Sequence, residues 1–298
     1  MNDDQTRRPA YDRTTQDVGN IVELGHLNVR VPDQRLATLF YVTGLGLTRD
    51  PYLMTGVENM WINAGTGQFH LPSGPAQVLR GTTGLVLPDR AALLRRLSGV
   101  RGRLQGTHFA FREAADCVEV TCPWGNRLRC HAPDAAHFGR ITLGMPYIEI
   151  AVGEGTSEGI VRFYKEILAT PASAGSDAQG RFARVPVGLG ESLLFRETAA
   201  SLAAYDGHHI QIALADFSGP HGRLAARGLI SEESNESQYR FETIVDPAGG
   251  AVLATIEHEV RSMRHPMYAR PLVNRDPDIT NNRYAPGREA WAPAMPPE

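Results

Sequence analysis

The feature that most constrains the fold is a segment type that recurs four times along the chain. Each copy is a short run of alternating apolar and polar residues that predicts a strand, and a predicted helix follows it. Helices are expected near residues 34–43, 90–97, 158–168 and 222–227, and short apolar runs after each helix predict further strands, including one at Asp50–Met54. The four strand-to-helix starts begin at Gly25, Gly84, Tyr147 and His209. We therefore expect an α+β chain of four βαβββ units between Ile21 and Val260.

The length and composition of the chain favour two domains. With 298 residues, of which 42% are hydrophobic, the chain is long enough for two cores. A stretch rich in Ala, Pro and Asp around residues 132–139 separates the second unit from the third. We expect domains at 20–132 and 141–262, a flexible N-terminal tail at 1–19 and a C-terminal extension at 263–298, because neither end has the composition of a core.

Charge and cysteine content narrow the classes of partner. The net charge of -3 and the pI near 6.4 give no reason to expect nucleic acid or an anionic membrane as partner. The chain has an odd number of cysteines, Cys117, Cys122 and Cys130, and their spacing matches no zinc motif. No apolar leader is expected at the N-terminus, so we expect reduced thiols in the cytoplasm. The expected partner is a small-molecule substrate, and the chain is expected to be a monomer or a homodimer.

Five stretches carry a resemblance to a known family. They read GHLNVRVPD at 25–33, FYVTGLGL at 40–47, FYKEIL at 163–168, GHHI at 207–210 and DPAGG at 246–250. With the βαβββ repeats, they resemble the vicinal oxygen chelate superfamily of glyoxalases and extradiol dioxygenases. The resemblance implies a tandem fold in which four modules form two half-barrel cups, with a metal held by the first and last strands of each unit. It leaves the activity open, since this superfamily hosts isomerases, lyases, dioxygenases, thiol transferases and metal-free drug-binding proteins.

Matching positions of the first and fourth units offer metal ligands. His26 and His70 fall on the first and last predicted strands of the first unit, and His209 and Glu257 fall on those of the fourth. All four meet in one cup if unit one pairs with unit four, whereas pairing one with two leaves both cups short of ligands. Such ligands suit a divalent metal, with Fe(II) expected first and Mn, Ni, Co or Zn as alternatives.

Several alternatives stay open at these positions. Glu259 shares a strand face with Glu257 and is an alternative ligand. A strand histidine such as His26 is often a hydrogen-bonded core residue, and His70 also fits the end of a strand. In the other cup the corresponding positions are Thr82, Arg129, Tyr147 and approximately Phe195, which bind no metal.

Other polar residues are candidates for binding or catalysis near the metal. Asn28 and Gln211 follow His26 and His209 by two residues and so share their strand faces. Gln68, Tyr239 and Glu242 are also expected near the cup, although a structural role is equally compatible with each.

Three functions fit this pattern. The first is a non-haem iron oxygenase or dioxygenase acting on a small aromatic or enolisable substrate, because Glu257 alone leaves no second carboxylate to move a proton. The second is a glyoxalase-like lyase or isomerase that uses the metal as a Lewis acid. The third is a metal-free binding or resistance protein. The segment at 261–276 is expected to cover either the cup of units one and four or a partner's surface.

Overall fold

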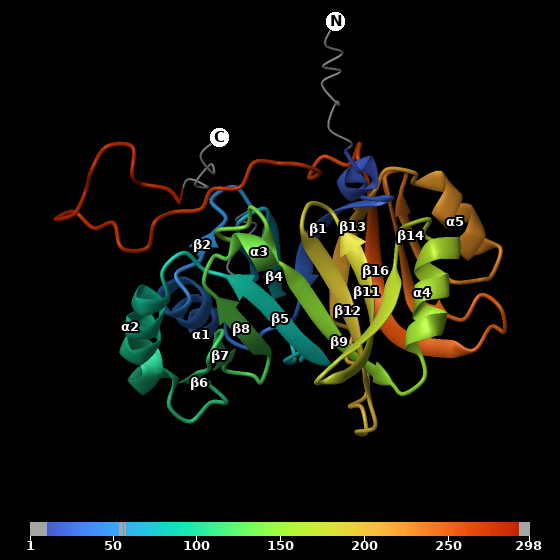
Figure 1. Cartoon of the computed structure of the whole chain (residues 1–298). Helices are drawn as coiled ribbons and strands as arrows, with labels where there is room; N and C mark the ends of the chain where they lie inside the picture. Colours follow the sequence, from blue (N-terminus) through green and yellow to red (C-terminus); the bar gives the residue numbers. More distant parts are fainter. Residues whose placement is uncertain (1–10, 54–55, 57, 292–298) are drawn as a thin grey trace, which may run out of the picture.

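The described chain forms two eight-stranded mixed sheets. The computed structural model describes residues 11–53, 56 and 58–291. One sheet has the strand order β14-β15-β16-β13-β1-β4-β3-β2, and the other has the order β10-β11-β12-β9-β5-β8-β7-β6 (Figure 1). Units 1 and 4 therefore share the first sheet and units 2 and 3 share the second, which confirms the pairing predicted from the positions of the histidines.

Each unit has one strand, one helical segment and three further strands. Unit 1 comprises β1 (Ile21–Asn28), α1 (Gln34–Ala37) continued by a π-helix (Thr38–Gly44), β2 (Thr48–Arg49), β3 (Asn59–Ala64) and β4 (Gly67–Pro72). Unit 2 comprises β5 (Gly81–Val86), α2 (Arg90–Val100), β6 (Ala110–Glu113), β7 (Val118–Thr121) and β8 (Arg127–His131). A short helix α3 (Ala135–Phe138) lies in the segment that joins the halves of the chain.

The second half repeats the pattern. Unit 3 comprises β9 (Tyr147–Gly153), α4 (Ser157–Glu166), β10 (Ser173–Asp177), β11 (Gly180–Val187) and β12 (Glu191–Thr198). Unit 4 comprises β13 (His209–Leu214), α5 (Ser218–Ala225), β14 (Ile230–Asn235), β15 (Gln238–Val245) and β16 (Val252–Ser262). The four predicted βαβββ units are confirmed.

The helix starts follow from local capping. Asp33 Oδ1 accepts hydrogen bonds from the backbone N–H groups of Arg35 and Leu36, at 2.7 and 3.0 Å. Asp89 caps α2 in the same way, accepting from Ala92 N at 2.9 Å. Each aspartate satisfies amides that have no partner within the helix, so the chain turns from strand to helix where the Pro-Asp pairs predicted it.

Three strand predictions differ from the structure. A strand was expected at Asp50–Met54, but the strand found there is the short β2, which ends just before Asp50. The Asp50 carboxylate accepts hydrogen bonds from Tyr52 N and Leu53 N and turns the chain. Met54 lies outside the described residues. Strands β10 and β14 were not predicted. Both are edge strands with mostly exposed, polar residues, so they lack the apolar alternation that marks a half-buried strand.

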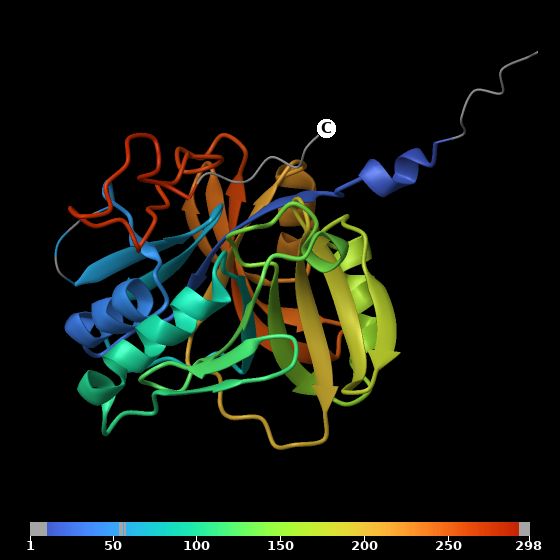
Figure 2. The same ribbon diagram turned by 60° about the vertical axis from the view of Figure 1, so that its left-hand side comes forward.

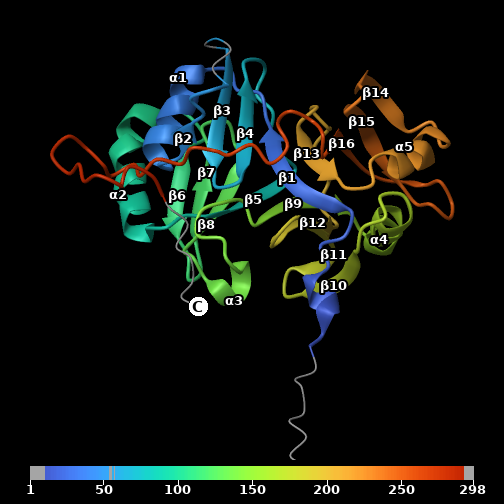
Figure 3. The ribbon, with the colours of Figure 1, turned by 90° about the horizontal axis from the view of Figure 1, so that it is seen from above.

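The core lies between the sheets and the helices of each half. Tyr41 packs on Phe69 at a ring-centroid distance of 5.0 Å, and Phe163 packs on Phe241 at 5.8 Å. Figures 2 and 3 show the helices of units 1 and 2 together on one side of the molecule and those of units 3 and 4 on the other. Each sheet therefore spans both halves, and its face opposite the helices forms a cup. We call the cup of units 1 and 4 the first cup and that of units 2 and 3 the second cup.

The structure describes only part of the predicted N-terminal tail and C-terminal extension. Residues 13–16 form a single 3-10 turn, while residues 1–10 and 292–298 lie outside the described residues. Among the helices that the structure describes, none has the length and apolar character to cross a bilayer.

Candidate metal centre

Three histidines come together on the floor of the first cup. His26 on β1, His70 on β4 and His209 on β13 each present one ring nitrogen, and these atoms lie within 4.8 Å of one another. The ring centroids of His26 and His70 are 5.5 Å apart, and those of His26 and His209 are 5.7 Å apart. The predicted histidines thus converge from three adjacent strands.

Burial favours the neutral form of His26 and His70. His26 is 1% exposed and His209 is 8% exposed, and the Nε2 atom of each is buried without a hydrogen-bond partner among the described residues. Burial lowers the pKa of His26 well below its usual range and lowers the pKa of His70 to about 3. Neutral imidazole is the form that binds a metal ion, so the cluster fits a divalent cation.

Neighbouring side chains hold His70 in place. Its Nδ1 accepts from Asn28 Nδ2 at 2.7 Å, and its Nε2 then donates to Asn59 Oδ1 at 2.6 Å. The ring also stacks on Trp61 with a centroid distance of 3.8 Å and an interplanar angle of 11°. Asn28, a candidate from the sequence, therefore positions His70, and metal binding by His70 would require it to give up one of these two hydrogen bonds.

Two carboxylates on β16 flank His209. Glu257 Oε1 lies 3.3 Å from His209 Nδ1, and Glu259 Oε2 lies 3.6 Å from His209 Nε2. Neither carboxylate is part of the group whose atoms lie within 4.8 Å of all three histidines. Both instead pair with Arg240, whose Nη2 lies 2.5 Å from Glu259 Oε2, and Glu259 also pairs with Arg261 at 2.7 Å.

The strand register distinguishes the two glutamates. In unit 1, His70 on β4 lies opposite Asn28 on β1. In unit 4, the residue opposite Gln211 on β13 is Glu259, while Glu257 lies opposite His209. Strands β1 and β13 pair with Asn28 opposite His209 and with His26 opposite Gln211. Gln211 is therefore the counterpart of Asn28. Glu259, opposite Gln211, is the counterpart of His70. The register thus favours Glu259, the alternative to Glu257 in the sequence analysis.

Glu259 is also the more buried of the pair, and its surroundings favour the ionised form. Its side chain is 5% exposed, against 26% for Glu257. Burial alone would raise the pKa of Glu259, but the adjacent His209 ring and the positive charges of Arg261 and Arg240 hold it well below its usual range. An ionised, buried carboxylate beside neutral imidazoles is a suitable ligand for a cation.

Two further candidates lie at the rim and wall of the cup. Gln211 is 1% exposed, and a Cβ atom at Gly25 would lie 1.7 Å from its Oε1, so the glycine makes room for this amide. Glu242 is half-buried on β15, and its charge, together with burial and the charge of Glu257, raises the pKa of the Tyr205 hydroxyl. That hydroxyl accepts from Glu257 N at 2.9 Å, which places Glu242 near the outer edge of the carboxylate pair.

The prediction that Tyr239 lies near the cup is wrong. Its ring packs on Phe217 at 4.9 Å and on His221 at 5.0 Å, both from the α5 region, so it faces the helix side of the sheet. Residues 239 and 242 are three apart on one strand and cannot both face the cup in regular β structure. Arg240, the neighbour of Tyr239, carries the positive charge that the sequence analysis missed.

Several charged groups that sequence reasoning missed complete the first cup. Arg261 shares the face of Glu257 and Glu259, and the every-second-residue spacing of these three charges was the available signal. Asp50 accepts from Gln68 Nε2 at 3.1 Å and from Arg270 Nη2 at 2.5 Å. Gln68 thus supports the wall of the cup through Asp50.

A C-terminal strap, residues 263–278, closes the first cup. Met267, Arg270 and Leu272 line, with His26 and Gln211, a pocket of only about 20 Å³. Asn274 fixes the strap by donating to Gly65 O at 2.9 Å and accepting from Gly65 N at 3.1 Å. Figure 3 shows this segment crossing unit 1 above β1 and β4. Of the two roles expected for it, the structure shows the cover over the cup of units 1 and 4.

At the equivalent positions of the second cup, the described residues supply no such set of ligands. The positions of His26, His70 and His209 are occupied by Thr82, Arg129 and Tyr147, as predicted. Arg129 lies opposite Gly84 as His70 lies opposite Asn28, and Thr82 lies opposite Glu149 as His26 lies opposite Gln211. Phe195 was misplaced by one residue: it is fully buried and packs on Tyr164 of α4, so it faces the helix side. Leu194, opposite Glu149, takes the position of Glu259.

Comparisons with known proteins agree with this architecture. No family model matches the sequence, and no curated protein matches it. Among solved structures, glyoxalase I from Zea mays matches with a TM-score of 0.56 and 13% identity, over 85% of this chain and 95% of that one. A putative dioxygenase from Bacillus subtilis matches with a TM-score of 0.53 and 13% identity, over 83% and 86% of the two chains. The chain therefore shares the fold of these structures, the tandem arrangement with two half-barrel cups that the sequence analysis predicted.

Proposed function

We propose that the chain is a metal-dependent enzyme whose centre lies in the first cup, held by His26, His70, His209 and Glu259. The observation that carries this proposal is the convergence of ring nitrogens from three histidines within 4.8 Å, and two of these histidines have a buried Nε2 with no hydrogen-bond partner among the described residues. Burying such polar atoms without a partner costs free energy, and a bound cation would remove that cost.

The same surroundings indicate a small, anionic substrate. Arg240, Arg261 and Arg270 all reach the cup and pair with Glu257, Glu259 and Asp50, and Glu232 also pairs with Arg240. A divalent ion bound beside these three arginines would attract an anionic substrate. The small closed volume beneath the strap admits a large substrate only if the strap moves.

The first candidate activity is a non-haem iron oxygenase acting on an aromatic or enolisable acid. A nitrogen-rich ligand set suits Fe(II) among other divalent metals, and bound iron would supply redox chemistry with dioxygen. In this scheme, Asn28 and Trp61 orient His70, while Arg261 holds Glu259 ionised and aligned.

A specific observation favours a second candidate, a glyoxalase-like isomerase or lyase. The oxygenase was preferred from the sequence because a second carboxylate was not expected, yet Glu257 and Glu259 both flank His209. With Glu259 as the metal ligand, Glu257 remains as a base that accepts an α-proton acidified by the Lewis-acidic metal.

One experiment separates these activities from each other and from a metal-free binding protein. Protein stripped of metal is reloaded with Fe(II), Mn(II), Ni(II), Co(II) or Zn(II) under anaerobic conditions and assayed with a panel of small aromatic and 2-oxo acids. Oxygen consumption with Fe(II) alone supports the oxygenase, and turnover without oxygen uptake supports the isomerase or lyase. Failure to retain any of the five metals would overturn both activities.

A further inference from the structure

The second cup holds a fixed positive charge at a position where the first cup holds a metal-ligand candidate. The register places Arg129 on β8 opposite Gly84 on β5, as His70 lies opposite Asn28. Gly84 leaves room for the ring of Tyr147, since a Cβ atom there would lie 2.4 Å from Tyr147 Cε1. The two cups therefore share a backbone plan, but a guanidinium has taken the place of an imidazole.

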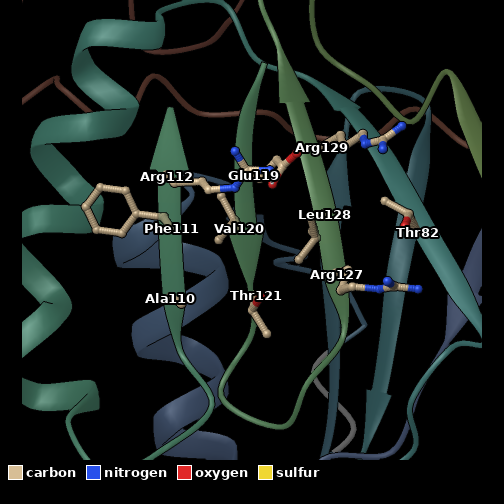
Figure 4. Close-up of a pocket in the computed structure, with 10 residues that line it drawn as sticks. All are labelled: Thr82, Ala110, Phe111, Arg112, Glu119, Val120, Thr121, Arg127, Leu128 and Arg129. Carbon is tan, nitrogen blue, oxygen red and sulfur yellow. Dashed lines mark ion pairs between the residues drawn. The ribbon is translucent and has the colours of Figure 1, made fainter. Parts of the chain in front are cut away.

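A pocket of about 420 Å³ opens over this arginine, far larger than the one in the first cup. Figure 4 shows the side chains of Arg127 and Arg129 extending from β8 toward the strand that carries Thr82. Ala110 and Thr121 share the sheet face of these arginines, whereas Val120 and Leu128 point into the core on the helix side. A cavity of this size with a few convergent charged and polar groups is suited to a small organic anion.

The positive charge of the pocket is not neutralised. Arg112 pairs with Glu119 at 2.6 Å, and Arg196, on the neighbouring wall, pairs with Asp177 at 2.6 Å. Among the described residues, Arg127 and Arg129 form no ion pair with a carboxylate, although Glu149 is close enough to raise the pKa of Arg129. Two guanidinium groups are thus left to face the cavity.

Tyr147 and His131 form a hydrogen-bonded pair beside Arg129. The Tyr147 hydroxyl lies 2.9 Å from His131 Nε2 and close enough to the Arg129 guanidinium to raise the pKa of Arg129. Burial lowers the pKa of His131, so the neutral ring accepts the hydroxyl proton and its Nδ1 faces the backbone carbonyl of Asp116 at 3.3 Å. A cation whose orientation is set in advance loses less entropy on binding than a mobile one.

We propose that the second cup is a metal-free binding site for a small organic acid, with the carboxylate held by Arg129 and Arg127. The planar guanidinium matches a carboxylate with two parallel hydrogen bonds. This site is independent of the metal centre, since none of its residues lies in the first cup.

Calorimetric titration with benzoate tests this assignment, with benzamide as the neutral isostere. Benzoate is expected to bind once per chain and benzamide to bind at least about tenfold more weakly, because only the acid offers a charge. Arg129→Gln and Arg127→Gln are each expected to weaken benzoate binding about tenfold. Arg127 is exposed, so its variant should fold even if Arg129→Gln does not, and circular dichroism checks both.

Two controls locate the site. Arg95→Gln removes an equal charge from the exposed side of α2 and should leave benzoate binding unchanged, as should His209→Ala in the first cup. Three results would overturn the proposal: equal affinity for benzamide, no benzoate binding at millimolar concentration, or loss of binding in His209→Ala with retention in Arg129→Gln. Binding of inorganic phosphate in preference to benzoate would overturn the assignment to organic acids.

Discussion

The two cups have the same strand plan and opposite chemistry. In the first cup, three buried or half-buried histidines and two glutamates gather beneath the C-terminal strap, around a pocket of about 20 Å³. In the second, Thr82, Arg129, Tyr147 and Leu194 occupy the equivalent positions beside an open pocket of about 420 Å³. The fold therefore fixes where ligands converge, while a few inward-facing side chains decide what is bound there.

The difference also shows how charge is used in each cup. Arg240 and Arg261 in the first cup are paired with Glu257 and Glu259, so they hold carboxylates near the histidines. In the second cup, Arg129 lies beside the Tyr147 hydroxyl, forms no ion pair with a carboxylate among the described residues and keeps its charge available. The same residue type therefore positions a metal ligand in one cup and is proposed to bind the ligand directly in the other.

The largest effect is expected from separating the two glutamates of the first cup. Glu259→Gln should weaken metal binding by about 100-fold or more, because it removes a ligand and leaves Arg261 without its partner. Glu257→Gln is the matched control on the same strand face and should change metal affinity by less than about tenfold. Isothermal titration with Mn(II) measures both, and a larger loss in Glu257→Gln would restore Glu257 as the ligand.

A smaller effect is expected from opening the first cup. Ending the chain after Ser262 removes the strap, including Met267, Arg270 and Leu272. Metal release to a chelator should accelerate about tenfold, since the pocket becomes accessible to solvent and Asp50 loses its partner Arg270. Benzoate binding in the second cup should be unchanged. Unaltered release of metal would show that the strap does not control access.

The smallest effect concerns Glu191, at the start of β12 and in contact with the backbone of Leu24 in the other sheet. Burial raises the pKa of Glu191 to about 8. The folded form therefore retains a proton that the unfolded form loses, and stability should fall as the pH rises from about 4.5 to about 8.

Glu191→Gln should remove that dependence. Compared with the parent chain, the variant is expected to be more stable at pH 8 by an amount on the order of 2 kcal/mol and nearly unchanged at pH 4.5. Urea unfolding across this pH range measures the effect. A parallel pH profile in the two proteins would contradict a raised pKa at this position.

Much of the fold could be predicted from the sequence because local residue patterns mark each repeat. Alternating strands and the Pro-Asp helix starts predicted the βαβββ units, and the positions of His26, His70 and His209 predicted which units pair. The edge strands β10 and β14 were missed because exposed strands need no apolar alternation. The face of a strand on which a residue lies was predicted less well. Tyr239 and Phe195 were each placed on the wrong face, because an error of one residue moves a side chain to the opposite face of the sheet.

The charged framework of the site was not accessible in the same way. Arg240 on β15 reaches Glu257 and Glu259 on the neighbouring strand β16, and Arg270 reaches Asp50 across 220 residues of sequence. Such pairs depend on register and on the path of the strap, which local patterns do not record. The choice between Glu257 and Glu259 likewise needed the pairing of β13 with β16.

Metal stoichiometry tests the difference between the cups most directly. Protein purified without oxygen should contain about one divalent metal per chain, and His209→Ala should abolish it. Tyr147→Phe, the variant at the equivalent position of the second cup, should leave the metal content unchanged. Absence of stoichiometric metal in the parent protein, or its retention in His209→Ala, would contradict the assignment of the first cup as the metal centre.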